Sequence, residues 1–292
     1  MSQLRRLATV VLLVALAPSP GGSQLVFRWP IRTSPRPEAV LDGAQAVFWN
    51  PGALAAGIAS GREVWIVHVD GPDVTGVRGV AAAGVADLPL GVRAGVGYWH
   101  LGIQDIPRTT DSPETDPGEL SVAEDVAVVS GARVIARNLG VGGALRFARS
   151  TVGALDRSRV EGELGLHLQT RHPWRPSLGI MVSGLGGTVS GLAGAEVSTP
   201  ALASGRLPIQ FGYGVKTGSK WEPAAHRLAI RGSWMEQIHG GVGLSYLGSR
   251  NGWVRLWMLG IDVGRYSLGI MREGLANGFG AIHFYRAAIR FP

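Results

Sequence analysis

The sequence predicts an all-β fold, a transmembrane antiparallel β-barrel of about fourteen strands, with twelve as the alternative. Three observations predict it. The chain opens on an export signal, apolar and polar residues later alternate with a two-residue period in segments of about ten residues, and glycine accounts for 44 of 292 residues. An interior glycine costs a helix about 1 kcal/mol relative to alanine, whereas barrels place glycine at bends and crowded interior positions.

The first 23 residues are predicted to be a cleaved signal peptide. Arg5 and Arg6 precede an uncharged apolar run over 7–17, and small and turn-forming residues follow up to Ser23. The run is shorter than the about 20 apolar residues that a membrane-spanning helix needs, so an uncleaved anchor is the less favoured alternative. With the strand pattern that follows, this predicts export to the outer membrane of a Gram-negative cell.

Charge and cysteine content limit the function classes. Cleavage removes two of the 28 basic residues and none of the 21 acidic ones, which lowers the net charge from +7 to +5. No basic block with interleaved aromatic residues occurs, so we expect a weak attraction to anionic lipid or lipopolysaccharide and no nucleic-acid partner. An exported chain without cysteine must be held together by backbone pairing or packing, which a closed barrel supplies.

The segment before the predicted barrel, Gln24 to Gly61, has no strand period and is interrupted by prolines. It is predicted to be either a periplasmic extension or a plug, and a barrel of about fourteen strands has room for part of it. Exposed in the periplasm, its aromatic and leucine side chains would leave an apolar patch in water, so we favour a plug. The residues expected against the inner wall are Phe48, Trp49, Asn50, Pro51 and Leu54.

The barrel itself is predicted over 62–292, where alternation assigns side chains to two faces. Leu164, Leu166, Phe211 and Ile230 are expected on the lipid face. The lumen-facing set is expected to be Arg93, Arg146, Glu161, Glu163, His167, Gln169, Lys216, Arg227 and Arg231. A soluble β-sandwich would also alternate. Tryptophans near the predicted strand ends favour a barrel with interfacial girdles, namely Trp99, Trp174, Trp221, Trp234, Trp253 and Trp257.

Thirteen strands can be counted in the pattern, one short of the even number that bacterial barrels have. They begin near residues 62, 75, 90, 121, 139, 158, 176, 207, 225, 240, 252, 265 and 278. Long connections over 103–120 and 187–206 are expected outside the cell. Short turns over 137–139 and 249–252 are expected in the periplasm.

The last predicted strand alternates toward an aromatic residue. Tyr285, Ile289 and Phe291 share one face, a pattern similar to the recognition signal of the barrel-assembly machinery, although Pro292 follows the phenylalanine.

One motif carries a family resemblance. Residues 42–55 read DGAQAVFWNPGALA, which resembles the N-terminal signature of PorV/PorQ-type outer-membrane proteins, relatives of the FadL fatty-acid transporters. The signature has small residues, an aromatic, then Asn-Pro-Ala and a leucine, and Gly52 stands here in place of the usual alanine. A looser similarity continues through SVAED at 121–125, LGVG at 139–142 and GELG at 162–165.

The resemblance implies a barrel of about fourteen strands with an N-terminal luminal element. It further implies either passage of hydrophobic or small solutes, or a sealed structural barrel that serves type IX-like secretion or surface attachment. Exported proteins or a secretion complex are then possible partners.

Enzyme motifs are missing from the sequence. No nucleophile elbow, zinc-binding HExxH, P-loop or dinucleotide fingerprint occurs, and no cofactor or metal site is expected. His167 and His172 are five apart, which places them on opposite faces of a strand. The acidic stretch from Asp105 to Glu119 is interrupted by prolines and is predicted to be a solvated loop rather than a cation site.

Overall fold

The computed structural model describes residues 33–56, 61–107, 119–185, 189–200, 207–217, 225–235, 237–247, 252–275 and 280–291. The predicted signal peptide and residues 24–32 lie outside the described residues. No helix in these ranges is long and apolar enough to cross a membrane.

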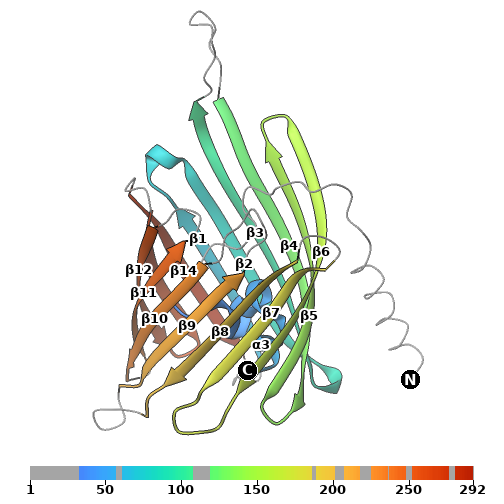
Figure 1. Ribbon diagram of the computed structural model, residues 1–292, viewed down its shortest axis with the longest axis vertical. Coiled ribbons are helices and arrows are strands. Elements are labelled where there is room, and N and C mark those ends of the chain that lie inside the picture. Colours follow the sequence, from blue (N-terminus) through green and yellow to red (C-terminus); the bar gives the residue numbers. More distant parts are fainter. Residues whose placement is uncertain are drawn as a thin grey trace, which may run out of the picture.

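In the described part, the chain forms a closed antiparallel barrel of fourteen strands, which confirms the predicted fold class (Figure 1). Each strand pairs with its sequence neighbours, and β1 pairs with β14 from Arg62↔Phe291 to Asp70↔His283, which removes both sheet edges. The strands are β1 (Arg62–Asp70), β2 (Val77–Leu88), β3 (Val92–Pro107), β4 (Glu119–Ala136), β5 (Leu139–Val152), β6 (Leu155–Gln169), β7 (Ser177–Leu185), β8 (Ser190–Ser198), β9 (Ile209–Thr217), β10 (Ala225–Trp234), β11 (Ile238–Leu247), β12 (Gly252–Val263), β13 (Tyr266–Gly274) and β14 (Ala281–Phe291).

Strand β8 is the one that the count of thirteen omits, and it lies inside the predicted long loop over 187–206. Its inward residues include the buried Ser190, Leu192 and Glu196, whereas its outward positions begin with Gly191, Ala193 and Ala195. Because both faces carry small residues, the strand lacks the large outward apolar side chains that mark its neighbours.

The predicted loop layout is wrong for the turn over 249–252. We call the end at which β1 begins and β14 ends the proximal rim, and the other end the distal rim. The 137–138 turn lies at the proximal rim, but the connection from β11 to β12 joins the distal rim, together with the connection from β3 to β4. The turn over 249–252 was expected beside the 137–138 turn because both are short, and the number of strands between them places it at the opposite rim.

Alternation along the strands sorts side chains between the lumen and the outer face. On β6, Glu163 and His167 are 2% and 3% exposed, whereas Leu164 and Leu166 are 55% and 45% exposed. Phe211 and Ile230 likewise point outward, at 44% and 48% exposed. The barrel is therefore apolar outside and polar inside over these strands.

The tryptophans divide between the two faces. Four lie exposed on the outer side, namely Trp174, Trp234, Trp253 and Trp257, and Trp221 lies outside the described residues. The expectation for Trp99 is wrong, because it points into the lumen, is 4% exposed and stacks on Phe48 at 5.9 Å between ring centroids. The position of a tryptophan near a predicted strand end does not show whether its side chain points outward to lipid or inward to another aromatic ring.

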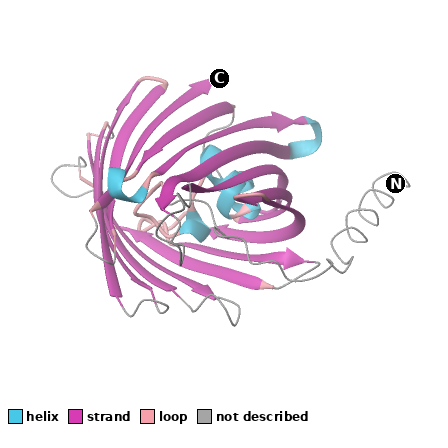
Figure 2. Ribbon diagram, turned by 90° about the horizontal axis from the view of Figure 1, so that it is seen from above, coloured by secondary structure: helices cyan, strands magenta, loops and turns pink. Residues whose placement is uncertain are grey.

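Short helices occupy the interior. They are η1 (Glu38–Val40), η2 (Gly43–Gln45), α2 (Ala46–Trp49) and α3 (Pro51–Ala56), and Figure 2 shows helices enclosed by the ring of strands. Two further turns, η3 (Asp73–Thr75) and η4 (Pro89–Gly91), connect strands at the rims. We call residues 33–56 the luminal segment.

Candidate functional site

The luminal segment packs against one side of the barrel. Helix α3 contacts β3 to β7, α2 contacts β3 and β4, η1 contacts β7 and β8, and η2 contacts β1 and β2. Nine of the 27 described residues of the buried apolar core cluster belong to it, and Val47, Phe48, Leu54 and Ala39 among them are at 1% exposure or less. Burial of each large side chain contributes about 1.5–3 kcal/mol, so the interior, not solvent, is the stable environment for this segment.

Asn50 anchors the segment to the wall. Its side-chain amide donates to the backbone oxygen of Ala39 at 2.6 Å and to that of Leu166 on β6 at 3.0 Å. Its Oδ1 accepts from the N–H of Gly52 at 3.0 Å, and the residue is fully buried. The asparagine of the Asn-Pro motif thus joins the turn, the preceding segment and the barrel wall in one set of bonds.

Glycines on β5, β6 and β7 form the surface that receives the segment. A Cβ on Gly140 would lie 2.4 Å from the backbone oxygen of Gly52, one on Gly142 would lie 2.4 Å from that of Pro51, and one on Gly179 would lie 1.8 Å from that of Ala39. These distances exclude side chains, so backbone packs directly on backbone. We call Gly140, Gly142, Gly165 and Gly179 the glycine seat.

Gly52 also departs from the usual alanine for a steric reason. A Cβ on Gly52 would lie 2.6 Å from the backbone oxygen of Gly165, and a Cβ on Gly165 would lie 2.1 Å from Oδ1 of Asn50. The two glycines face each other across a direct backbone contact between segment and wall. Alanine at position 52 would require the turn to move away from β6.

Aromatic and charged contacts hold the next part of the segment. The ring centroid of Phe48 lies 6.0 Å from that of Trp65 and 5.9 Å from that of Trp99. Arg146 donates to the backbone oxygen of Phe48 at 2.9 Å, pairs with Glu163 at 2.6 Å and lies 5.8 Å from the ring centroid of Trp99. A buried arginine is stable only with such partners, so these contacts fix the position of Phe48.

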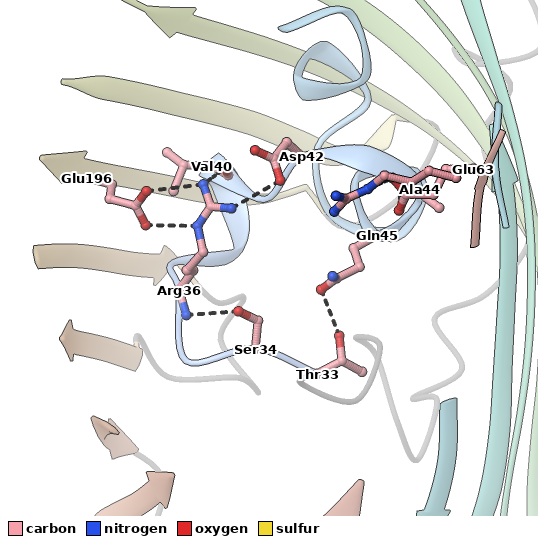
Figure 3. A network of polar contacts seen from close by, with 10 residues as sticks. Thr33, Ser34, Arg36, Val40, Asp42, Ala44, Gln45, Glu63 and Glu196 are labelled. Carbon is pink, nitrogen blue, oxygen red and sulfur yellow. Dashed lines mark hydrogen bonds and ion pairs between the residues drawn. The ribbon is translucent and has the colours of Figure 1, made fainter. Parts of the chain in front are cut away.

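Arg36 makes a second set of charged contacts (Figure 3). Its guanidinium binds both carboxylate oxygens of Glu196 on β8, at 2.9 and 3.1 Å, and also donates to Asp42 and to the backbone oxygen of Val40, each at 3.1 Å. Burial opposes the charge of Arg36, but Asp42 and Glu196 outweigh it and raise the pKa of Arg36. Glu38 forms a parallel pair with Arg227 on β10 at 2.6 Å.

Asp42 lies at the boundary between this network and an internal cavity. Its side chain is 47% exposed to the enclosed space. Enclosure opposes ionisation, but the positive charges of Arg36 and Arg231 outweigh that effect and lower the pKa of Asp42. The carboxylate therefore stays charged at neutral pH and keeps its contact with Arg36.

The sequence-derived lumen set is found at the following places. Arg93, Arg146, Glu161, Glu163, His167 and Arg227 are buried inside the barrel, and Gln169, Lys216 and Arg231 are partly buried. Among the expected plug residues, Phe48, Trp49, Asn50 and Leu54 are at most 4% exposed, and Pro51 lies on Gly142. On β14, Tyr285 and Phe291 are exposed and Ile289 pairs with Val64 and Tyr266.

Several interior residues escaped sequence reasoning. Glu196 was hidden because its strand was assigned to a loop, and Trp65 because β1 was not resolved into faces. Arg36 lies in a proline-rich stretch with no period, so nothing in the sequence pairs it with a residue 160 positions later. The expected outward face of β14, with Tyr285, Ile289 and Phe291, implies that Arg286 points inward, but it does not identify the neighbours of Arg286 in space.

Comparisons with known proteins bear on the fold. No family profile matches the sequence, and no curated protein is similar to it. Among solved structures, the toluene transporter TbuX of Ralstonia pickettii is similar with a TM-score of 0.58 and 11% identity, over 86% of this chain and 94% of that one. The toluene transporter TodX of Pseudomonas putida gives 0.56 and 12%, over 91% and 98%.

The outer membrane protein Omp33 of Acinetobacter baumannii gives a TM-score of 0.53 and 11% identity, over 80% of this chain and 98% of that one. At these identities the likeness establishes a shared architecture. The chain has the fold of outer-membrane β-barrels, and the luminal segment is its candidate functional site.

Proposed function

We propose that this chain is an outer-membrane channel for small or hydrophobic solutes, and that residues 33–56 are its plug. The proximal rim would face the periplasm, as the short 137–138 turn suggests. Solutes pass when the plug leaves the glycine seat. The observation that carries the proposal is the glycine seat, because the wall has glycine at the positions where the plug's backbone lies against it. A barrel with no need to open could fill its lumen with side chains from the wall and would not need a separate segment.

Two further features support passage of hydrophobic solutes. TbuX and TodX are described as toluene transporters and share the architecture. On the distal side of the plug, an apolar recess of about 20 Å³ is bordered by Phe48, Trp65, Val67, Trp99 and Leu101. A small apolar molecule would meet this aromatic surface before it reaches the plug.

A disulfide tether tests whether the plug must move. The chain has no cysteine, so the pair Ala39→Cys and Gly194→Cys would be unique. A Cβ on Gly194 would lie 3.3 Å from that of Ala39 and 2.9 Å from that of Pro37, so a small shift of the segment that relieves Pro37 also brings the pair to the usual disulfide separation of about 3.5–4.5 Å. We expect the oxidised protein to show no openings in a planar bilayer and reduction to restore them, with Gly194→Cys alone as the control. Openings that persist in the fully oxidised protein would rule out plug displacement.

A second candidate function is a sealed barrel that assists type IX-like secretion or surface attachment. The buried pairs Arg36–Glu196 and Glu38–Arg227 favour it, since they join the plug to the wall, and Arg146 of the wall also donates to the backbone oxygen of Phe48. Such a barrel would conduct in neither redox state and would copurify with exported proteins. Solute uptake by liposomes containing the reduced protein would exclude it.

A further inference from the structure

The luminal segment leaves a polar cavity on the side of the barrel opposite the glycine seat. The cavity measures about 70 Å³ and lies between the segment and the wall formed by β10, β12, β13, β14 and β1. One water needs about 10–15 Å³ in this measure, so the cavity has room for a small ion with a few waters. Its charged lining consists of Arg36, Asp42, Glu63, Arg231, Asp262, Arg286 and Arg290.

The three carboxylates of this lining already have partners. Asp42 accepts from Arg36 at 3.1 Å, and Asp262 lies 2.9 Å from Nε2 of His239. Glu63 accepts from the N–H of Ala44 at 3.1 Å and lies 3.5 Å from Nε of Arg290. These contacts hold the acids to the segment and to the wall.

Arg231 and Arg286 are different. Within the described residues, neither guanidinium has a hydrogen bond or an ion pair, and both Nε atoms are buried without a partner. An unpaired buried charge is costly, and two of them in one cavity repel each other. An anion between them would remove both costs.

The wall is shaped to hold Arg286 in this position. A Cβ on Gly269 would lie 2.4 Å from Nε of Arg286, and a Cβ on Gly260 would lie 3.1 Å from one of its terminal nitrogens. Gly269 pairs with both Arg286 and Gly260 across β12 to β14. The side chain therefore lies flat over two glycines, and any larger residue at position 269 would displace it.

We infer that this cavity is a binding site for a small oxyanion, held by the guanidinium groups of Arg231 and Arg286. Guanidinium donors match phosphate and carboxylate oxygens in pairs, so inorganic phosphate and the carboxylate of a small organic acid share the required chemistry. If the chain is the channel proposed above, on which this step rests, the two arginines select the solutes that pass along this wall for negative charge.

Calorimetric titration of the purified full-length chain with phosphate and, separately, acetate tests the site. We expect binding to the unaltered protein and a loss of about tenfold or more in affinity for Arg231→Gln and for Arg286→Gln. Arg265→Gln, at the exposed β12–β13 turn where Arg265 contacts Tyr266, is the matched control and should bind as the unaltered protein does. Tighter binding of phosphate or of acetate identifies the source of the anion.

The unaltered protein tests the site even where a variant fails to fold. If it binds neither phosphate nor acetate, the proposed site is wrong. Reversal potentials in a KCl gradient separate this inference from the proposed function. Openings that prefer chloride in the unaltered protein and lose that preference in Arg286→Gln support both. Openings without anion preference and without binding overturn the site alone, whereas binding without any opening supports the site and overturns the channel.

Discussion

Gly52 of the luminal segment and Gly165 of strand β6 face each other at backbone contact, such that a Cβ on Gly52 would lie 2.6 Å from the carbonyl oxygen of Gly165. The segment and the wall are therefore fitted to each other by the removal of side chains. Adding a single methyl group at this contact is therefore expected to displace the segment from the wall.

Neighbouring glycines on β5 provide a matched pair of substitutions. Gly142→Ala places a methyl group 2.4 Å from the backbone oxygen of Pro51, whereas a Cβ on the outward Gly143 has its nearest contact at 3.6 Å. We expect Gly142→Ala to destabilise the seated plug by about 1–3 kcal/mol, a shift of about 5- to 150-fold toward release. Open probability in planar bilayers measures it. Equal open probabilities for Gly142→Ala and Gly143→Ala would contradict the seat.

Asn50→Asp tests the anchor at almost constant shape. The change removes the donors to Ala39 and Leu166 and leaves their carbonyl oxygens facing a carboxylate, at a cost of about 1–3 kcal/mol for each unsatisfied group. We expect faster amide hydrogen exchange over 46–56 while the strands stay protected. Unchanged exchange in this range would mean that Asn50 does not hold the segment.

Much of the architecture could be predicted from the sequence, because inward and outward residues alternate wherever the outer face carries large side chains, as at Leu164 and Leu166 on β6. The prediction failed at β8, where Gly191, Ala193 and Ala195 give the outer face no apolar signal. The number of strands could therefore not be predicted, nor could the rim at which each connection after β7 lies.

The site was predictable only in part. The aromatic and Asn-Pro residues indicated an element with no strand period and too apolar for water, but its partners depend on strand register. The register of β5 and β6 places Arg146 opposite Glu161, and Arg146 pairs with Glu163, the next residue on the same face of β6. Arg36 pairs with Glu196, which lies 160 residues later in the chain. Trp99 was assigned to a girdle because only the fold reveals Phe48 beside it.

Leu166→Arg tests the outer face. Leu166 is 45% exposed on β6, and an arginine in the middle of a bilayer costs about 2–4 kcal/mol. We expect a loss of that size in urea unfolding in lipid. Leu90→Arg makes the same change at the proximal rim, where the residue is 76% exposed, and should cost about 0–1 kcal/mol. A larger loss at Leu90 than at Leu166 would place the membrane elsewhere.

The contact between Asp42 and Arg36 predicts a pH dependence. The pKa of Asp42 in the folded chain lies below its unfolded value of about 3.9. The stability that ionised Asp42 gives to the seated plug is therefore complete above about pH 3.9, and it is lost as the pH falls through the lower folded pKa. We expect constant open probability from pH 8 to about pH 5 and a rise only below about pH 4. Asp42→Asn should be more open throughout and lose the acid rise; a rise between pH 5 and 7 would assign the response to another group.

Single-channel recording of a chain lacking residues 33–56 tests the closing role of the luminal segment most directly. The barrel closes through β1 and β14 without these residues, so heat-modifiable gel migration should persist in the deleted protein. We expect a large, continuously open conductance in that folded barrel, against rare openings of the full-length chain. A deleted barrel that migrates as folded and yet stays closed would contradict the assignment of residues 33–56 as the plug.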